Sequence, residues 1–415
     1  MQKLKNVYLV GGAVRDQLLG MSSHDKDYVV VGASIKDMLA NGFKPVGKDF
    51  PVFLHPETKD EYALARTERK VGKGYTGFQV DASENVSLED DLARRDLSIN
   101  AMALDEHGNI IDPFNGQHDL EQKVLRHTTA AFVEDPVRVL RVARFLARYG
   151  NEWKIHDETK ALFWQMKEQQ ELSALVPERV WKETEKALNE PHPHLYFEAL
   201  DGLGIFPELE CMHNVKQSAT HHPEGDVWIH TMLVLKRAAD LQYDLPTRFA
   251  ALTHDFGKPV VYAQTGKLHG HEAAGVPIID KFCQRLRVPN KLKELAELTS
   301  YYHLHTHKMA ELTPKTLYKV VIGGFNAVKQ PARFLQFLHA CECDSQGRGP
   351  TKENQEYKSL AFGKYLLDGL IAFDTKVIVK EAIEKGKTGP DIGEAVRIAQ
   401  IQAIAALKDA YASKA

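Results

Sequence analysis

The stretch VYLVGGAVRDQLLGMSSHDKDYVVV, residues 7–31, decides how the fold begins. Its two ends, residues 7–10 and 28–31, are short runs of β-branched and apolar residues, which is the composition of strands. A glycine pair ends the first run and opens a helix-like segment. Strand, glycine turn, helix and strand in this order predict the start of a small α/β domain.

The glycine turn is a candidate phosphate site. Backbone N–H groups at the start of a helix attract anions, and the helix dipole strengthens the attraction. Gly12 lies at the turn, and Arg15 follows with a positive charge. A glycine pair after a strand is also common as a plain tight turn, so this segment alone predicts no ligand.

Two carboxylates precede or open the second strand. Asp25 and Asp27 are one residue apart, and in extended chain this spacing puts both side chains on one face. Mg²⁺ prefers carboxylates together with substrate phosphates, so the pair suits nucleotidyl transfer. Taken alone, Asp-Lys-Asp is also an ordinary polar turn. Glu61, before another strand-like run, is a weaker candidate for a third carboxylate.

The strand-like pattern ends near residue 125 and helical periodicity replaces it. Residues 61–65 and 109–112 are further predicted strands, whereas the chain beyond residue 132 has few strand candidates. We therefore expect an α+β protein. Its predicted parts are a small mixed α/β head (residues 1–130), a mostly α-helical neck (131–212), a histidine-rich helical domain (213–350) and a helical tail (351–415).

One neck helix carries an arginine face. At 100° per residue, Arg138, Arg141, Arg144 and Arg148 fall on one side of the helix, with apolar residues opposite. Solvated helix faces normally mix Lys and Glu with Arg, and this face has neither. A solvated amphipathic helix remains the usual explanation for such a stripe.

A second chemistry is indicated by the histidines, many of which fall between residues 213 and 307. His230 lies in a helix-like run, and the segment LTHDFGK is expected to place the adjacent His254 and Asp255 on another helix. Imidazole and carboxylate ligands suit a divalent transition metal that activates water against a phosphate ester. Asp344 is a candidate final carboxylate. A single histidine is more often an ordinary core or surface residue.

Composition excludes several classes of protein. The chain has 415 residues with 43% hydrophobic and 26% charged residues, and no apolar run is long enough to span a membrane. Its start lacks a secretion signal, so we expect a cytoplasmic location. The four cysteines include no CxxC pair, which argues against a disulfide framework or a zinc ribbon. The net charge of −3 neither supports nor excludes RNA binding.

The order of the first motifs resembles the nucleotidyltransferase fold of the DNA polymerase beta superfamily. The segment RRDLSINA, residues 94–101, is similar to the RRDxxxNA element of class II CCA-adding enzymes and bacterial poly(A) polymerases. EDPVR, residues 134–138, is similar to their EDxxR element, and GKGYTGF, residues 72–78, lies where the family has a flexible loop. The resemblance assigns nucleotide contacts to Arg95, Asp96, Asp135, Arg138, Arg141 and Arg144, with Asp135 and Arg138 reading the base.

The histidine region resembles an HD-domain phosphohydrolase, with His230, His254, Asp255 and Asp344 as implied metal ligands. His271 and His303 are accessory candidates, and the sequence does not choose among His303, His305 and His307. A nucleotidyltransferase joined to an HD domain is similar to the bacterial multifunctional CCA proteins. This implies addition of C, C and A to tRNA that lacks all or part of its 3′ CCA, from CTP and ATP with Mg²⁺. It also implies 2′,3′-cyclic phosphodiesterase, 2′-nucleotidase and phosphatase activities with Ni²⁺, in a monomer or homodimer.

Three alternatives remain open. A bacterial poly(A) polymerase shares the head motifs. A uridylyltransferase of the nitrogen-signalling type also joins a nucleotidyltransferase to an HD domain, but it modifies protein and needs regulatory domains for which this chain is short. A non-catalytic tRNA-binding module would have no use for intact Asp25, Asp27, His254 and Asp255.

Overall fold

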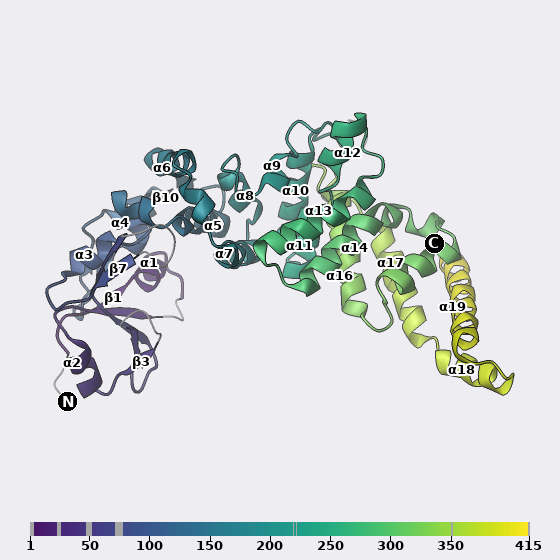
Figure 1. Cartoon of the computed structure of the whole chain (residues 1–415), viewed down its shortest axis with the longest axis horizontal. Coiled ribbons are helices and arrows are strands. Elements are labelled where there is room, and N and C mark those ends of the chain that lie inside the picture. Colours follow the sequence, from purple (N-terminus) through teal and green to yellow (C-terminus); the bar gives the residue numbers. More distant parts are fainter. Residues whose placement is uncertain are drawn as a thin grey trace. The chain divides into compact units, whose positions relative to one another are not determined.

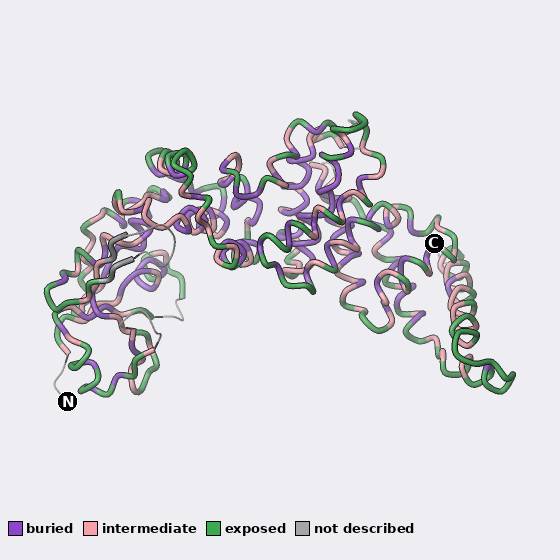
Figure 2. The backbone as a smooth tube through the Cα atoms, viewed as in Figure 1, coloured by how far each residue is buried: buried purple, intermediate pink, exposed green. Residues whose placement is uncertain are grey.

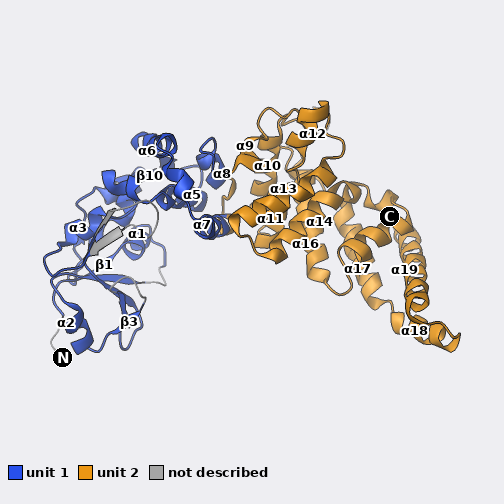
Figure 3. Cartoon of the chain, in the orientation of Figure 1, with its two compact units in different colours: residues 1–187, 195–205 blue, residues 188–194, 206–415 orange. Residues whose placement is uncertain are grey.

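The computed structural model describes residues 4–22, 26–46, 52–70, 78–218, 220, 222–349 and 352–413. The chain forms two compact units (Figure 3). The first contains residues 1–187 and 195–205, and the second contains residues 188–194 and 206–415. All named strands of the described chain belong to the first unit, and helices build the second (Figure 1).

The core of the first unit is a seven-stranded mixed sheet with the strand order β3-β4-β5-β2-β1-β8-β9. Strand β2 runs parallel to β5, and the other neighbours are antiparallel. Two small sheets pair β6 with β7 and β10 with β11. The strands are β1 (Val7–Val10), β2 (Asp27–Val30), β3 (Lys44–Val46), β4 (Val52–Leu54), β5 (Glu61–Leu64), β6 (Thr67–Lys70), β7 (Phe78–Asp81), β8 (Ala103–Leu104), β9 (Ile110–Ile111), β10 (Val124–Leu125) and β11 (Lys154–Ile155).

Helices surround this sheet and form the neck. The α-helices that begin in the first unit are α1 (Gly12–Leu18), α2 (Ile35–Ala40), α3 (Leu88–Ala93), α4 (Gly116–Glu121), α5 (Val137–Tyr149), α6 (Asp157–Glu168) and α7 (Pro177–Asn189). The shorter 3₁₀ helices are η1 (Ser98–Asn100), η2 (Ala130–Glu134) and η3 (Glu171–Ala174).

The remaining helices follow α8 (His194–Leu200), which lies mainly in the first unit. In the second unit the α-helices are α9 (Pro207–Glu210), α10 (Val227–Asp240), α11 (Leu245–Thr253), α12 (Lys258–Thr265), α13 (His271–Leu286), α14 (Asn290–His307), α15 (Pro314–Tyr318), α16 (Pro331–Gln346), α17 (Lys358–Ala372), α18 (Thr375–Glu384) and α19 (Gly389–Ala412). A 3₁₀ helix, η4 (Met309–Glu311), and a π-helix, η5 (Lys319–Gly324), complete it.

Burial follows the alternation of the strands. One face of the sheet packs Val10 and Val29 against Leu92 of α3, and the other packs Val30 and Leu64 against Met38 of α2. In the second unit, phenylalanines of α16 and their neighbours form the centre of a large apolar cluster. Helices α18 and α19 consist mainly of exposed and intermediate residues (Figure 2), and their buried residues are Ala382 and Ile404. No helix in the described ranges combines the length and apolar character that a membrane crossing requires.

The α+β prediction is confirmed, with local corrections. Residues 7–10 form β1 as expected, whereas the second strand begins at Asp27, one residue earlier than the apolar run. His254 and Asp255 do not lie on a helix body, because α11 ends at Thr253 and α12 begins at Lys258. The predicted loop at residues 72–78 falls outside the described residues except for Phe78 at the start of β7.

The turn between α11 and α12 is pressed against helix α13. A Cβ atom added at Gly257 would lie 1.9 Å from the carbonyl oxygen of His271 and 2.6 Å from the backbone nitrogen of Gly275. Backbone atoms cannot move aside as a flexible side chain can. Glycine at position 257 is therefore what allows the turn carrying Asp255 to approach the first residue of α13, His271.

We expect Gly257→Ala to lower the free energy of unfolding of the second unit by about 1–3 kcal/mol, because the new methyl group has no space. Gly393→Ala is the matched control. Gly393 is an exposed helical glycine with nothing near its added Cβ, so alanine there should be neutral or stabilise by up to about 1 kcal/mol. Urea unfolding of both variants measures the difference. Equal midpoints would contradict the packing argument.

Candidate functional sites

Strand pairing brings two carboxylates together in the head. Asp27 lies opposite Glu61 in the parallel pair β2–β5 and opposite Val10 in the pair β1–β2. Residues in register on neighbouring strands point to the same face, and both carboxylates are exposed. The weak candidate Glu61 thus gains support from the register. The other predicted ligand, Asp25, lies outside the described residues.

The glycine turn lies directly beside this carboxylate pair, because Gly11 follows Val10. Gly11 has a φ of +70°, and its N–H donates to the carbonyl of Met102 at 3.2 Å. A Cβ added there would lie 2.6 Å from Nη1 of Arg95. The glycine therefore lets the RRDLSINA segment lie against the turn, and Gly12 begins α1 at this junction.

Asn100 joins the two head motifs. Its side-chain oxygen accepts a hydrogen bond from Nη1 of Arg15 at 2.6 Å, and its amide nitrogen donates to Oδ1 of Asp96 at 2.9 Å. The other oxygen of Asp96 accepts from Nε of Arg141 at 2.6 Å. One continuous chain of polar contacts therefore runs from the glycine-turn helix α1 to the neck helix α5.

Asp96 is the charged centre of that chain. Burial alone would raise the pKa of its carboxyl, but the Arg141 guanidinium and the Asn100 amide outweigh burial and hold the pKa well below its usual range. Asp96 is therefore ionised at neutral pH. A buried carboxylate of this kind fixes the positions of the groups that neutralise it.

The arginine face of α5 is paired with carboxylates, although the side chains of Arg141 and Arg148 stay 37% and 28% exposed. Besides Arg141 with Asp96, Arg144 donates from Nε to Glu183 at 2.7 Å, and Arg148 lies 3.5 Å from Asp16. No sequence pattern pointed to Glu183, a buried residue of α7. Three arginines of this face are therefore paired with carboxylates of the protein itself.

Two predicted nucleotide contacts are buried and hydrogen-bonded within the protein. Arg15 is 4% exposed, and its guanidinium lies against Asp16 and Asn100. Arg138 is 8% exposed and donates to the backbone carbonyls of Ala131 and Arg94. Both are held because buried guanidinium groups need acceptors for their N–H groups.

Asp135 has a partner that sequence reasoning missed. Both of its oxygens accept from Arg179 of α7, at 3.2 and 2.9 Å, in a bidentate pair. Oδ1 also accepts from the backbone N–H of Val137 at the start of α5. The predicted base-reading carboxylate is thus placed at a helix start and paired with a forked cation. Arg179 lies 44 residues after Asp135 in the chain, so no local sequence pattern predicts that they pair.

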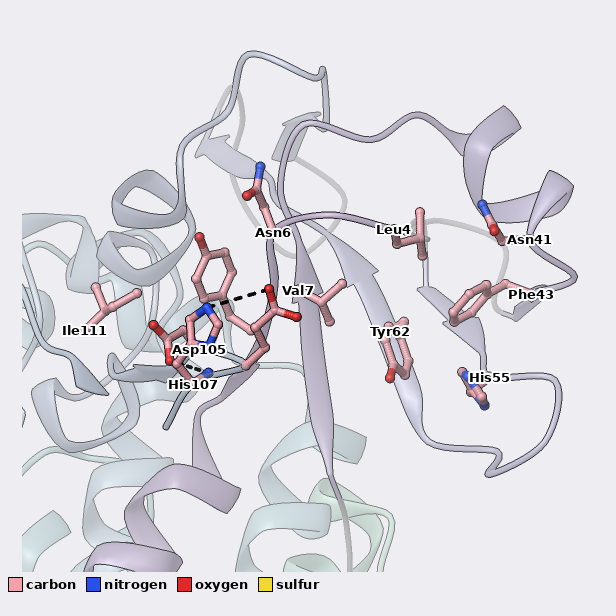
Figure 4. A pocket seen from close by; sticks show the side chains of 12 residues that line it. Leu4, Asn6, Val7, Asn41, Phe43, His55, Tyr62, Asp105, His107 and Ile111 are labelled. Carbon is pink, nitrogen blue, oxygen red and sulfur yellow. Dashed lines mark hydrogen bonds and ion pairs between the residues drawn. The ribbon is translucent and has the colours of Figure 1, made fainter. Parts of the chain in front are cut away.

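A cavity of about 750 Å³ lies elsewhere in the head, and none of the predicted site residues lines it. Tyr62, its central aromatic residue, follows Glu61 in β5 and so points to the opposite face of the sheet. Figure 4 shows Tyr62 beside Phe43 and His55. The cavity is therefore separate from the carboxylate pair.

In the second unit, four helices and one turn bring buried histidines and carboxylates together. The contributing residues are His230 on α10, His254 and Asp255 in the turn after α11, His271 at the start of α13, His303 on α14 and Asp344 on α16. All six are buried. They form two groups, in each of which the nitrogen and oxygen atoms lie within 4.8 Å of one another.

The first group contains His230, His254 and Asp344. Nε2 of His230 lies 3.1 Å from Oδ1 of Asp344, and Nε2 of His254 lies 3.8 Å from the same oxygen. Ligand atoms around an ion with bonds of about 2.1 Å are separated by roughly 3.0–3.4 Å. Small shifts would therefore let these three atoms surround one ion.

The second group contains Asp255, His271 and His303. Oδ1 of Asp255 lies 3.3 Å from Nε2 of His271 and 3.8 Å from Nε2 of His303. The two groups touch each other, because Nε2 of His254 in the first group lies 3.1 Å from Oδ2 of Asp255 in the second. Asp255 thus belongs with the two accessory histidines, and the site has the donors for two ions.

These residues fit divalent cations on two further observations. Nε2 of His254 and Oδ1 of Asp255 are buried without a hydrogen bond from any described residue, whereas Oδ2 of Asp255 lies 2.6 Å from Lys258. His254, His271 and His303 each hold Nδ1 at 2.7 Å from a backbone carbonyl, which leaves the lone pair on Nε2, and Nε2 of His271 lies 3.2 Å from Nε2 of His303. Burial also lowers the pKa of His303 to about 3, so its ring is neutral, as a ligand must be.

Cations surround the two carboxylates. Burial alone would raise the pKa of Asp255 and of Asp344, but neighbouring histidines, with Lys258 beside Asp255, outweigh it and keep both pKa values well below the usual range. Nζ of Lys258 lies 2.6 Å from Asp255, and Nη2 of Arg348 lies 3.4 Å from Asp344. Both carboxylates are therefore ionised and available to metal.

Helix α14 separates the three histidines that the sequence did not distinguish. His303 belongs to the second group, and Nε2 of His307, one turn later, lies 2.8 Å from Oδ2 of Asp344. His305 contacts Tyr302 instead and belongs to neither group. His303 and His307 are four residues apart and share one face of the helix, whereas His305 lies on a different face.

Three family models match successive parts of the chain. Residues 7–126 match the poly A polymerase head domain, and residues 153–212 match the probable RNA and SrmB-binding site of polymerase A. Residues 227–324 match the HD domain.

Solved structures share the fold. The Bacillus stearothermophilus CCA-adding enzyme in complex with CTP superposes with a TM-score of 0.63 at 23% identity, over 96% of this chain and 89% of that one. The Thermotoga maritima CCA-adding enzyme complexed with tRNA gives a TM-score of 0.62 at 22% identity, over 99% and 91% of the two chains.

Curated relatives are much more similar in sequence. The multifunctional CCA protein of Teredinibacter turnerae is 48% identical over 97% of this chain and 98% of its own length. That of Pseudomonas aeruginosa is 49% identical over the same shares. With this identity along nearly the whole chain, and with a polymerase-type head followed by an HD domain, the chain belongs to the multifunctional CCA protein family.

Proposed function

We propose that this chain adds cytidine, cytidine and adenosine in turn to the 3′ end of tRNA, using CTP and ATP and no nucleic-acid template. The observation that carries the proposal is the polar chain from Arg15 through Asn100 and Asp96 to Arg141, because it joins the glycine turn to the arginine helix. Membership of the CCA protein family supports the choice of tRNA as substrate.

The exposed carboxylates at the start of β2 and β5 belong to the proposed catalytic centre. Asp25 and Asp27, with Glu61 in register beside Asp27, would hold Mg²⁺. The ion would favour the deprotonated 3′ hydroxyl of tRNA and neutralise the leaving pyrophosphate. Gly12 and Arg95 at the turn would contact the triphosphate through backbone N–H groups and a guanidinium.

Base choice is proposed to lie with Asp135 and Arg138. A carboxylate and a planar guanidinium offer acceptors and donors that match the edges of both cytosine and adenine. Asp135 is held by Arg179 and Arg138 by backbone carbonyls, so both must exchange partners when a nucleotide binds. Arg141 and Arg144 would support the triphosphate, and Arg15 would act by positioning Asn100.

For the second unit we propose a metal-dependent phosphohydrolase acting on 2′,3′-cyclic phosphates, 2′-nucleotides and phosphate monoesters, with Ni²⁺ as the favoured ion. His230, His254 and Asp344 would hold one ion, and Asp255, His271 and His303 a second. Bound ions would supply a water molecule made acidic at neutral pH. Lys258, Arg348 and His307 border the carboxylates as cations or proton donors for the phosphate ester.

We also propose domain boundaries at residues 130, 212 and 350, and a monomer or homodimer as the oligomeric state.

The rival function is that of a bacterial poly(A) polymerase, which the head-domain match alone would equally allow. The substrate range separates the two, because a poly(A) polymerase has no use for CTP.

The function is tested with tRNA that ends at its discriminator base. We expect incubation with CTP alone to add two cytidines, and CTP with ATP to yield ends that read CCA and stop. Sequencing of the product ends measures both results. The control is the same tRNA with a complete CCA end, which should not grow. A run of adenosines, or no use of CTP, would contradict the proposal.

The two centres are separated by reciprocal variants. Asp27→Asn keeps size but removes the charge that binds cations, so nucleotide addition should fall at least about 100-fold while hydrolysis of a 2′,3′-cyclic nucleotide stays unchanged.

His254→Ala is the matched control and should give the reverse pattern, because it removes an imidazole from the first metal group only. Rates of labelled CTP incorporation and of phosphate release measure the two activities on the same preparations. Loss of both activities in either variant would show that one centre does not work without the other.

A further inference from the structure

We propose that Glu224 is a positioning residue of the metal centre, which holds the ring of His230 with its proton on Nδ1 so that Nε2 is free to bind an ion. Glu224 lies in the loop before α10, and its Oε1 is 2.8 Å from Nδ1 of His230. The inference rests on the proposed metal-dependent function of the second unit.

His230 differs from the other histidines of the two groups. His254, His271 and His303 each place Nδ1 at 2.7 Å from the carbonyl oxygen of the residue three positions earlier. His230 has no such carbonyl partner in the described structure and faces a carboxylate instead. A charged acceptor makes the opposite ring nitrogen more basic than a neutral carbonyl does.

The ring of His230 must present Nε2 to the metal. That atom lies 3.1 Å from Asp344 and 3.7 Å from Asp255. A neutral imidazole carries one proton, so Nδ1 must bear it and needs an acceptor. Oε1 of Glu224 is within hydrogen-bond distance of Nδ1. The N–H bond of His230 does not point at this oxygen, so the carboxylate must turn to accept the hydrogen bond.

Glu224 is itself held in place for this role. Nδ1 of His222 lies 2.9 Å from the same Oε1, and the rings of His222 and His230 meet edge to face with centroids 4.8 Å apart. The side chain of Glu224 is 3% exposed, and its Oε2 has no hydrogen bond from any described residue. A buried carboxylate with unused acceptor capacity can turn to align with His230.

His222, Glu224 and His230 also lie close enough together to be considered as ligands of an ion themselves. Their contacts of 2.8 and 2.9 Å are hydrogen-bond distances, shorter than the roughly 3.0–3.4 Å between ligand atoms around an ion with bonds of about 2.1 Å. Among the six residues of the two metal groups, the contacts of Asp255 and Asp344 with Nε2 atoms are longer, at 3.1 to 3.8 Å. Glu224 is therefore assigned to the second layer around the metal.

The test is titration of the metal-stripped full chain with Co²⁺, followed by calorimetry and by the visible absorption of the bound ion. We expect two sites in the unchanged protein. Glu224→Gln should weaken the site of His230 by about 10- to 100-fold and leave the site of His271 and His303 unchanged. Glu294→Gln, a surface change at a 58% exposed side chain, is the matched control and should alter neither site.

The second site reports whether the variant folds. Equal affinities in Glu224→Gln and the unchanged protein would overturn the role of Glu224 while leaving the proposed function intact, and loss of both sites would overturn it in favour of a general structural role. A third ion, lost in Glu224→Gln, would make Glu224 a ligand instead. An unchanged protein that binds no divalent ion would overturn the proposed function and this inference together.

Discussion

The polar chain that joins α1 to α5 in the first unit is centred on the buried carboxylate of Asp96. A carboxylate removed from water is costly unless cations and hydrogen-bond donors replace its hydration. Asp96 meets this need with Arg141 from the neck and Asn100 from its own segment, and Asn100 in turn accepts from Arg15 of α1. The requirement to neutralise one charge thus fixes three segments that are far apart in sequence.

The same physics organises the second unit with more charges. Asp255 and Asp344 are buried among imidazole rings and two cations, and both remain ionised because of those neighbours. The close approach that Gly257 permits brings α13, and with it His271, to Asp255. Backbone carbonyls set the tautomers of three rings, while a carboxylate faces the fourth.

The sequence allows prediction of features that depend on neighbouring residues. The apolar run at residues 7–10 and the arginine spacing of α5 both appear in the structure because strand and helix periods are local properties. Strand β3 was not predicted, since it is three residues long and contains Pro45, which a sheet tolerates only at its edge.

What could not be predicted depends on contacts between distant segments. The pairing of Asp135 with Arg179, and of Arg144 with Glu183, follows from how α5 and α7 pack. The choice of His303 over His305 needed the orientation of α14, and the partition of Asp255 and Asp344 between two groups needed all four helices. Motif resemblance predicted most of the candidate site residues but not the residues that pair with them.

The most direct measurement of the central claim is a double-mutant cycle between Asp96 and Arg141, with kcat/KM for CTP addition as the readout. Asp96→Asn and Arg141→Gln are measured singly and together. If one buried pair fixes the head against the neck helix, the double variant should be little worse than either single one, with a coupling free energy of about 1–3 kcal/mol. If the losses in activation free energy of the two single variants add up in the double variant, the two residues act independently, and this result would contradict the account.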